Sequence, residues 1–198
     1  MEKKDLKPAG VFKYFEEICQ VPRPSKKEEK MIAYLKTFGA KHNLETKVDE
    51  AGNVLIKKPA TPGKENLQTV VLQSHIDMVC EKNNDVQHDF LTDPIETEID
   101  GEWLKAKGTT LGADNGIGVA TDLAILADDS IEHGPLECLF TVDEETGLTG
   151  AFALQEGFMS GDTLLNLDSE DEGEIFIGCA GGIDSVAEFT YKEVEVPA

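Results

Sequence analysis

The chain has 198 residues, enough for one domain with a substantial core or for one domain and part of another. Its 39 acidic and 18 basic residues give a formal net charge of -21, which excludes nucleic acid and anionic membranes as partners in a sequence without a basic patch. No segment reads as a signal peptide or approaches the roughly 18 apolar residues of a membrane span. With four widely spaced cysteines, the sequence predicts a cytoplasmic protein with reduced thiols.

Two helices are predicted near the N-terminus. Residues 8–20 carry apolar side chains at helical spacing, and two prolines follow them. Ser25 is then expected to cap a second helix over roughly residues 26–43. We expect Met31 and Leu35 on the inner face of this second helix.

Strands are predicted next along the chain. Residues 44–50 and 53–58 are typical of a β-hairpin, because two short strand-like runs flank Ala51 and Gly52. The nearly continuous apolar run 68–75 is typical of a strand buried on both faces of a sheet. A further short strand is expected near Trp103.

The second half of the chain alternates between helix and strand patterns. Residues 115–128 predict a helix, and the runs 135–142, 164–168 and 174–178 predict three buried strands. This alternation predicts an α/β fold with a mixed, mainly parallel sheet flanked by helices. Residues 185–198 alternate like one more strand.

Polar residues follow the ends of three predicted buried strands. In open α/β sheets, ligands gather at the carboxyl ends of the strands, so we expect these side chains to converge although they are distant in sequence. The set comprises His75, Asp77, Asp143, Glu144, Glu145 and Asp168.

His75 alone would be interpreted as a structural histidine. Asp77 changes this interpretation, because a carboxylate two residues further along an extended chain lies on the same side and can hold the imidazole in the tautomer that binds metal. His88 and His133 have no such partner and are predicted to be surface or loop residues.

Asp114 lies in a glycine-rich loop just before the predicted helix 115–128. A phosphate-binding loop is disfavoured there, because the carboxylate would repel phosphate and no GKS or GKT sequence follows. Two interpretations stay open: Asp114 binds a ligand, or it caps the helix.

The acidic stretch that starts at Asp168 also fits a calcium loop at first sight. The pattern fails, because position twelve of the loop would be Cys179 instead of a bidentate acid. We therefore predict a solvated face for the acids that follow Asp168, namely Glu170, Asp171, Glu172 and Glu174.

One histidine with several carboxylates suits zinc, manganese or cobalt held as a pair, bridged by one carboxylate and one water. Such a pair polarises a carbonyl group, and a free carboxylate can move a proton from water to a leaving amine. These groups therefore predict amide hydrolysis.

Four motifs occur in one order: SHIDMV, GTTLGADNGIG, DEETGLTGAF and NLDSEDEGEIFIGCAGG. On these motifs, and over nearly its whole length, the chain resembles the aminoacyl-histidine dipeptidases (Xaa-His dipeptidases, or bacterial carnosinases) of the aminoacylase-like clan of dinuclear zinc peptidases. The resemblance implies two zinc ions, which cobalt or manganese can replace, and a bridging water that attacks the carbonyl of a Xaa-His dipeptide. It also implies a role for each residue: His75 ligates one metal, Asp114 bridges both, Glu145 binds the second, Asp168 completes the first, Asp77 orients His75, and Glu144 is the general base and acid.

The resemblance also bears on the organisation of the chain. Members of that family are more than twice as long, with an inserted lid or dimerisation domain and a late segment that supplies the last histidine ligand. Residues 1–186 are therefore expected to be the N-terminal part of the catalytic domain, and residues 187–198 the start of the insertion. Whether the full-length protein forms a homodimer stays open, and the 198 residues alone are expected to be inactive. The alternatives are a related metallo-deacylase or carboxypeptidase, and a non-catalytic metal-binding fragment.

Overall fold

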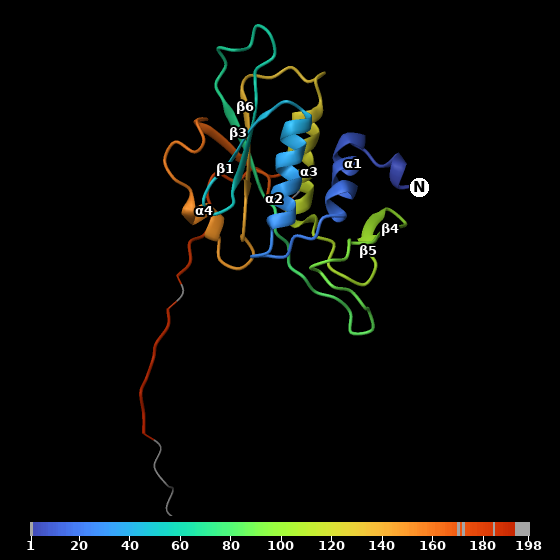
Figure 1. The fold of residues 1–198 in the computed structure, drawn as a ribbon, viewed down its shortest axis with the longest axis vertical. Coiled ribbons are helices and arrows are strands. Elements are labelled where there is room, and N and C mark those ends of the chain that lie inside the picture. The colour runs from blue at the N-terminus through green and yellow to red at the C-terminus, as the bar shows by residue number, and fades with distance from the viewer. Residues whose placement is uncertain (1, 170, 172, 184, 193–198) are drawn as a thin grey trace, which may run out of the picture. The chain divides into compact units, whose positions relative to one another are not determined.

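The computed structural model describes residues 2–169, 171, 173–183 and 185–192 (Figure 1). The chain divides into two units, Met1–Asp168 and Ser169–Ala198. All helices and strands of the described residues lie in the first unit. Among these helices, none is both long enough and apolar enough to cross a membrane.

The described part of the first unit contains a five-stranded sheet with the order β1-β2-β6-β3-β7. β3 pairs in parallel with β6 and β7, whereas β2 pairs antiparallel with β1 and β6. The predicted α/β fold with a mixed sheet is confirmed, and its parallel pairs lie together on one side of the sheet. The bounds are β1 (Glu45–Val48), β2 (Val54–Lys58), β3 (Val70–His75), β6 (Leu136–Thr141) and β7 (Thr163–Asn166).

Three helices lie on one side of this sheet: α1 (Ala9–Cys19), α2 (Glu29–Lys41) and α3 (Ala113–Ala127) (Figure 1). α2 and α3 pack against the strands, and α1 packs against α3. Their apolar stripes and the sheet form one continuous buried core, which includes the predicted Met31 and Leu35. All three predicted helices are confirmed within a few residues at each end. A short 3₁₀ helix, η1 (Lys3–Asp5), precedes α1.

The opposite face of the sheet has a smaller apolar cluster. Its centre is formed by Leu55, Val71 and Leu139 of the sheet. Leu154 and Phe158, which follow the short helix α4 (Thr149–Ala153), pack against these residues. A buried apolar layer thus lies on each side of the central strands.

The cap predicted for the second helix is wrong. α2 begins at Glu29, and the hydroxyl of Ser25 donates a hydrogen bond to Asp77 Oδ2 at 2.8 Å. Ser25 therefore bonds a side chain 52 residues away instead of the backbone of its own helix.

A separate two-stranded sheet lies outside the main one. It pairs β4 (Thr97–Asp100) with β5 (Trp103–Ala106) in antiparallel register. The strand expected near Trp103 is confirmed as β5, whereas its partner β4 was not predicted. Four of the eight residues in these two strands are exposed, which weakens the apolar pattern that identifies a strand.

The strand predicted at 164–168 is present as β7 but is not buried. It lies at the edge of the sheet, where Leu164 and Leu165 are 44% and 50% exposed. The apolar side chains predicted burial on both faces, but within the described structure only one neighbouring strand, β3, is available to β7.

The strand predicted at 174–178 is wrong. Its described residues have no strand structure, and Ile175 and Ile177 are 93% and 102% exposed. A strand needs a neighbour for its backbone hydrogen bonds, and none of the described residues pairs with this segment. The strand expected over 185–198 is likewise absent from residues 185–192, and residues 193–198 lie outside the described residues.

Two earlier expectations fall partly on the same region. Asp171 and Glu174 are exposed, as a solvated face requires, whereas Glu170 and Glu172 lie outside the described residues. The expected boundary between residues 186 and 187 concerns an inserted domain and stays a prediction.

A buried carboxyl group joins the central strand to a helix. Asp122 of α3 is fully buried and accepts a hydrogen bond from the hydroxyl of Ser74 in β3 at 2.9 Å. Burial raises the pKa of Asp122 from 3.8 to about 8, and the Ser74 bond opposes this rise. The folded chain therefore keeps Asp122 protonated at pH values where the unfolded chain ionises it, so its contribution to stability falls as pH rises from about 4 to about 8.

Replacing Asp122 with Asn should remove this pH-dependent loss. At pH 8 the free energy of unfolding of Asp122→Asn should exceed that of the unmodified chain by at least about 1 kcal/mol. The pKa of Asp122 is raised from 3.8 to about 8, and a shift of one pKa unit is worth about 1.4 kcal/mol. The gain should be absent at pH 4. Urea denaturation at both pH values measures it, with the exposed Glu156→Gln as a control for net charge. Equal gains at the two pH values would contradict the assignment.

Candidate metal centre

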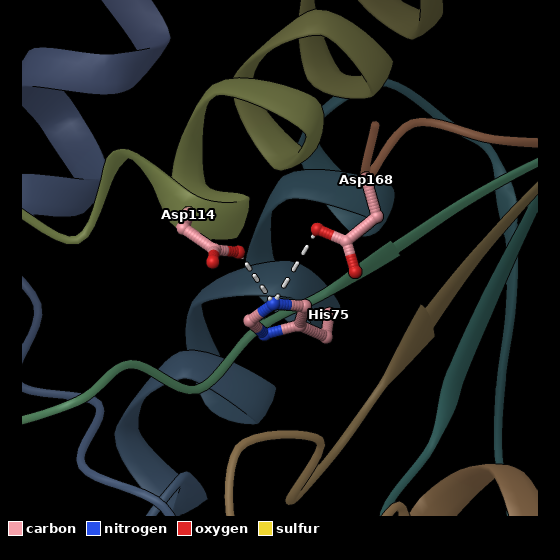
Figure 2. A group of neighbouring side chains, drawn as sticks. All are labelled: His75, Asp114 and Asp168. Carbon is pink, nitrogen blue, oxygen red and sulfur yellow. Dashed lines mark hydrogen bonds and ion pairs between the residues drawn. The ribbon is translucent and has the colours of Figure 1, made fainter. Parts of the chain in front are cut away.

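Parallel pairing brings the ends of β3, β6 and β7 to one edge of the sheet. His75 at the end of β3 pairs with Thr141 at the end of β6. Residues 143–145 follow β6, and Asp168 follows β7, so both lie near His75. The N-terminal end of α3 adds Asp114 at the same edge (Figure 2).

Three of the predicted ligands form a compact group. His75 Nε2 lies 2.9 Å from Asp114 Oδ1 and 3.7 Å from Asp168 Oδ1 (Figure 2). One ligand atom from each of the three residues lies within 4.8 Å of the other two. An imidazole nitrogen and two carboxylate oxygens at this spacing fit a divalent cation of the zinc, manganese or cobalt type.

The backbone around Asp114 decides between its two interpretations. The N-cap position of α3 is Gly112, and Asp114 and Asn115 have non-helical backbone angles at the entrance to the helix. The carboxylate of Asp114 contacts His75 instead of a backbone amide of α3. The geometry therefore favours the ligand interpretation over the helix-cap interpretation.

Asn115 holds Asp168 in place. Its Nδ2 donates to the carbonyl oxygen of Leu167 at 2.8 Å and to Asp168 Oδ1. Asn115 is 2% exposed, so its donor amide is shielded from solvent, and this strengthens both bonds. This residue was not predicted as part of the site, because its partners lie more than 50 positions away in the sequence.

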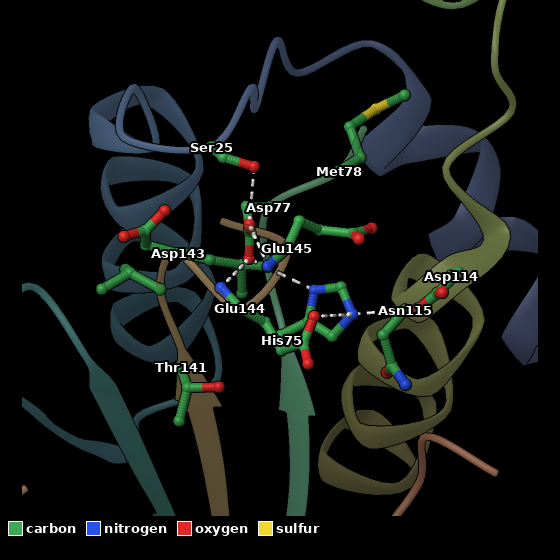
Figure 3. Close-up of polar contacts among 12 residues, drawn as sticks. Ser25, His75, Asp77, Met78, Asp114, Asn115, Thr141, Asp143, Glu144 and Glu145 are labelled. Atoms are coloured by element: carbon green, nitrogen blue, oxygen red, sulfur yellow. Dashed lines mark hydrogen bonds and ion pairs between the residues drawn. The ribbon is translucent and has the colours of Figure 1, made fainter. Parts of the chain in front are cut away.

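Asp77 lies behind the metal group and accepts four hydrogen bonds (Figure 3). Its Oδ1 accepts from His75 Nδ1 at 3.2 Å and from the amide of Glu144 at 3.0 Å. Its Oδ2 accepts from Ser25 Oγ at 2.8 Å and from the amide of Glu145 at 3.2 Å. Burial would raise the pKa of Asp77, but these bonds lower it to about 2, so Asp77 is ionised and orients both the imidazole and the acidic loop.

The acids around His75 create a negative potential. Burial would lower the pKa of His75, but the bond to Asp77 and the charge of Asp168 raise it to about 9. Burial raises the pKa of Glu144 and of Glu145, and neighbouring acids add to both shifts. Burial also raises the pKa of Asp168. A bound cation would relieve this repulsion, so the electrostatics agree with the donor set.

The three consecutive acids occupy different positions (Figure 3). Glu144 Oε2 lies 4.0 Å from His75 Nε2, outside the group of three ligand atoms. Glu145 also lies outside that group, and the negative charge of Asp114 contributes to the raised pKa of Glu145. Asp143 is buried in a turn with φ of +51° and accepts hydrogen bonds from two threonine hydroxyls.

A second set of acids is close together but already bonded. Ligand oxygens of Glu28, Asp77 and Asp143 also lie within 4.8 Å of one another, and all three residues are buried. The amide of Asp143 donates to Glu28 Oε1 at 3.0 Å, and the other two carboxylates accept the bonds described above. Backbone and hydroxyl donors therefore account for this cluster.

The other two predicted loop histidines lie away from the centre. His88 contacts Phe90 edge to face with ring centroids 4.4 Å apart, and His133 Nδ1 donates to the carbonyl of Gly134 at 2.7 Å. Neither belongs to a metal-binding group among the described residues.

A cavity of about 270 Å³ opens beside the centre. Glu144 and Asp168 line one part of it, and apolar side chains such as Leu139 and Leu154 line another. A small ligand in this cavity would therefore contact both carboxylates and an apolar surface.

Fold and site together define an α/β protein with a histidine–carboxylate group that could hold a metal ion at the carboxyl edge of its sheet. Residues 71–194 match the model of peptidase family M20/M25/M40, and the chain belongs to this family. The predicted resemblance to a peptidase family is thereby confirmed.

Individual relatives agree with this assignment. The chain is 51% identical over 197 residues to the cytosol non-specific dipeptidase of Escherichia coli (strain K12), and the match covers 100% of this chain and 41% of that protein. The structure of aminoacylhistidine dipeptidase from Vibrio alginolyticus matches with a TM-score of 0.88 and 56% identity, covering 90% of this chain and 36% of that one. Aminopeptidase PepT from Bacillus cereus matches at 26% identity with a TM-score of 0.70, covering 82% and 43%. The chain thus spans about two fifths of the length of these relatives.

Proposed function

We propose that this chain supplies the metal-binding part of a dipeptidase that hydrolyses dipeptides, with Xaa-His dipeptides as the preferred class. The observation that carries the proposal is the convergence of His75, Asp114 and Asp168, with the uncoordinated carboxylate of Glu144 4.0 Å from His75 Nε2. The chain is 51% and 56% identical to two proteins named as dipeptidases, which supports dipeptide hydrolysis as the proposed activity within the family. The name of the Escherichia coli relative agrees with the cytoplasmic location predicted from the sequence.

The proposed cofactor is a pair of zinc ions, replaceable by cobalt or manganese. His75 and Asp168 would hold the first ion, Glu145 the second, and Asp114 both. When bound, such ions would polarise the peptide carbonyl and lower the pKa of water. The donor set supports this proposal, since one imidazole and three carboxylates are ligand types that zinc accepts.

The proposed catalytic residue is Glu144. Its carboxylate accepts a proton from the attacking water as the new carbon–oxygen bond forms at the peptide carbonyl. The same group then gives that proton to the amine nitrogen as the carbon–nitrogen bond breaks. Asp77 contributes by fixing the backbone amide of Glu144 and the ring of His75.

The test uses the complete product of the gene that encodes this sequence, loaded with zinc. It should hydrolyse Xaa-His dipeptides faster than N-acyl amino acids or longer peptides, and His75→Ala should abolish hydrolysis. Faster hydrolysis of N-acyl amino acids would favour a deacylase. Faster removal of C-terminal residues from longer peptides would favour a carboxypeptidase. Since the 198 residues span only 41% of the Escherichia coli relative, we expect them to bind metal but to show negligible turnover by themselves.

A further inference from the structure

Arg23 is the only arginine in the sequence, because the other 17 basic residues are lysines. It lies between α1 and α2 and is 3% exposed. Among the described residues, its guanidinium bonds backbone carbonyl oxygens and forms no ion pair. A buried arginine costs free energy unless its donors are used, so these carbonyl contacts explain how the fold retains it.

The three acceptors of Arg23 belong to two separate segments of the metal centre. Nη1 donates to the carbonyl oxygens of Ile76 at 3.1 Å and Asp77 at 3.0 Å, just beyond the end of β3. Nη2 donates to the carbonyl oxygen of Gly112 at 2.5 Å, in the loop before α3. One planar group therefore joins the residue that follows His75 to the residue two positions before Asp114.

Two glycines leave the space that Arg23 occupies. A Cβ atom on Gly112 or on Gly116 would lie 2.6 Å from Arg23 Nη2, closer than atoms can approach. Gly112 also has a φ of +68°, a conformation that favours glycine. The α3 side of the contact is therefore shaped around the guanidinium.

We propose that Arg23 is a positioning residue that fixes the separation of His75 and Asp114, and with it the geometry of the metal centre. Its function is set by the planar fork, since two nitrogen atoms reach carbonyl oxygens on opposite segments at once. A lysine ammonium carries the same charge on one atom and cannot span both segments in this way. This inference rests on the proposed metal site.

The variant Arg23→Lys separates geometry from charge, because it keeps the positive charge and removes the fork. We expect it to weaken zinc binding by the 198-residue chain by about 10-fold or more, a loss typical of removing a partner that orients a ligand. The visible absorption bands of bound Co²⁺ should also change in position or intensity. Zinc affinity is measured by competition with a chromophoric chelator, and folding of each variant by circular dichroism.

Lys58→Met is the matched control. Lys58 is also a buried cation, 7% exposed, that donates to two backbone carbonyls, those of Ile125 at 3.0 Å and Asp128 at 2.7 Å. These acceptors lie at the opposite end of α3 from Asp114. Its loss should lower the melting temperature but leave zinc affinity and the Co²⁺ spectrum unchanged.

His75→Ala separates failure of this inference from failure of the proposed metal site. If His75→Ala binds Co²⁺ as the unmodified chain does, the proposed site is wrong. If it loses Co²⁺ while a folded Arg23→Lys keeps the unmodified affinity and spectrum, only the positioning role is overturned. An equal loss of affinity in Lys58→Met would also overturn it, because general destabilisation would then explain the effect. Should Arg23→Lys not fold, Arg23→Gln, which keeps two planar N–H donors, takes its place with the same expected loss.

Discussion

Replacing Glu144 with Gln should reduce dipeptide hydrolysis by about 10²- to 10⁴-fold, the usual contribution of a general acid or base. Gln keeps the length and shape of the side chain but cannot take a proton from water. The amide of Glu144 would still donate to Asp77, so the loop should keep its position. Zinc content should stay near that of the unmodified protein, since Glu144, unlike Glu145, is not among the residues proposed to bind either metal ion.

The neighbouring substitution Glu145→Gln is the matched control for this prediction. It removes one carboxylate from the same loop, but from a residue proposed to bind the second metal ion. We expect it to lower zinc content, whereas Glu144→Gln lowers turnover at constant zinc content. Both are measured in the complete gene product by dipeptide hydrolysis and by elemental analysis of zinc. Unchanged hydrolysis in Glu144→Gln would remove this residue from its catalytic role.

Asp77→Asn should weaken zinc binding by about 10- to 100-fold, although Asp77 is not a ligand. The carboxylate accepts four hydrogen bonds, and an Asn side chain has only one oxygen to accept them. Either the pair that includes His75 or the pair that includes Ser25 must then face an NH₂ group. His75 also loses the negative charge that supports its ligand tautomer.

Asp143→Asn distinguishes this effect from a general loss of packing. Asp143 is buried in the same cluster of acids and also accepts side-chain hydrogen bonds, but it does not contact His75. The Asp143→Asn variant should have lower thermal stability. Its zinc affinity should stay within about threefold of that of the unmodified chain, a difference below 1 kcal/mol. Affinities of the 198-residue chain are compared by chelator competition. Equal losses of affinity in the two variants would show that burial, and not orientation of His75, explains the role of Asp77.

Residue patterns predicted the central elements because these elements are determined locally. The run 68–75 and the helix pattern 115–128 each carry a long apolar signal, and both elements are present. His75 and Asp168 could be selected because their residue types follow predicted strands. Parallel pairing then explains why positions so distant in sequence lie together.

Contacts between distant segments could not be predicted in the same way. Ser25 has the residue type of a helix cap, yet its hydroxyl bonds Asp77, and only the tertiary fold brings the two together. Arg23 supports the centre by a bond to the backbone carbonyl of Asp77. Asn115 supports it by bonds to the backbone carbonyl of Leu167 and to the side chain of Asp168. No local spacing in the sequence encodes these bonds. The segment 174–178 has a strand pattern, but a strand also requires a partner.

The central claim is that His75, Asp114 and Asp168 hold one divalent cation. Crystals of the 198-residue chain grown with Zn²⁺, with diffraction data collected on both sides of the zinc absorption edge, locate the ion directly. We predict an anomalous difference peak about 2.0–2.2 Å from His75 Nε2 and from one carboxylate oxygen of each aspartate, the usual zinc–ligand distances. A fully occupied zinc peak elsewhere, with none between these three side chains, would contradict the account.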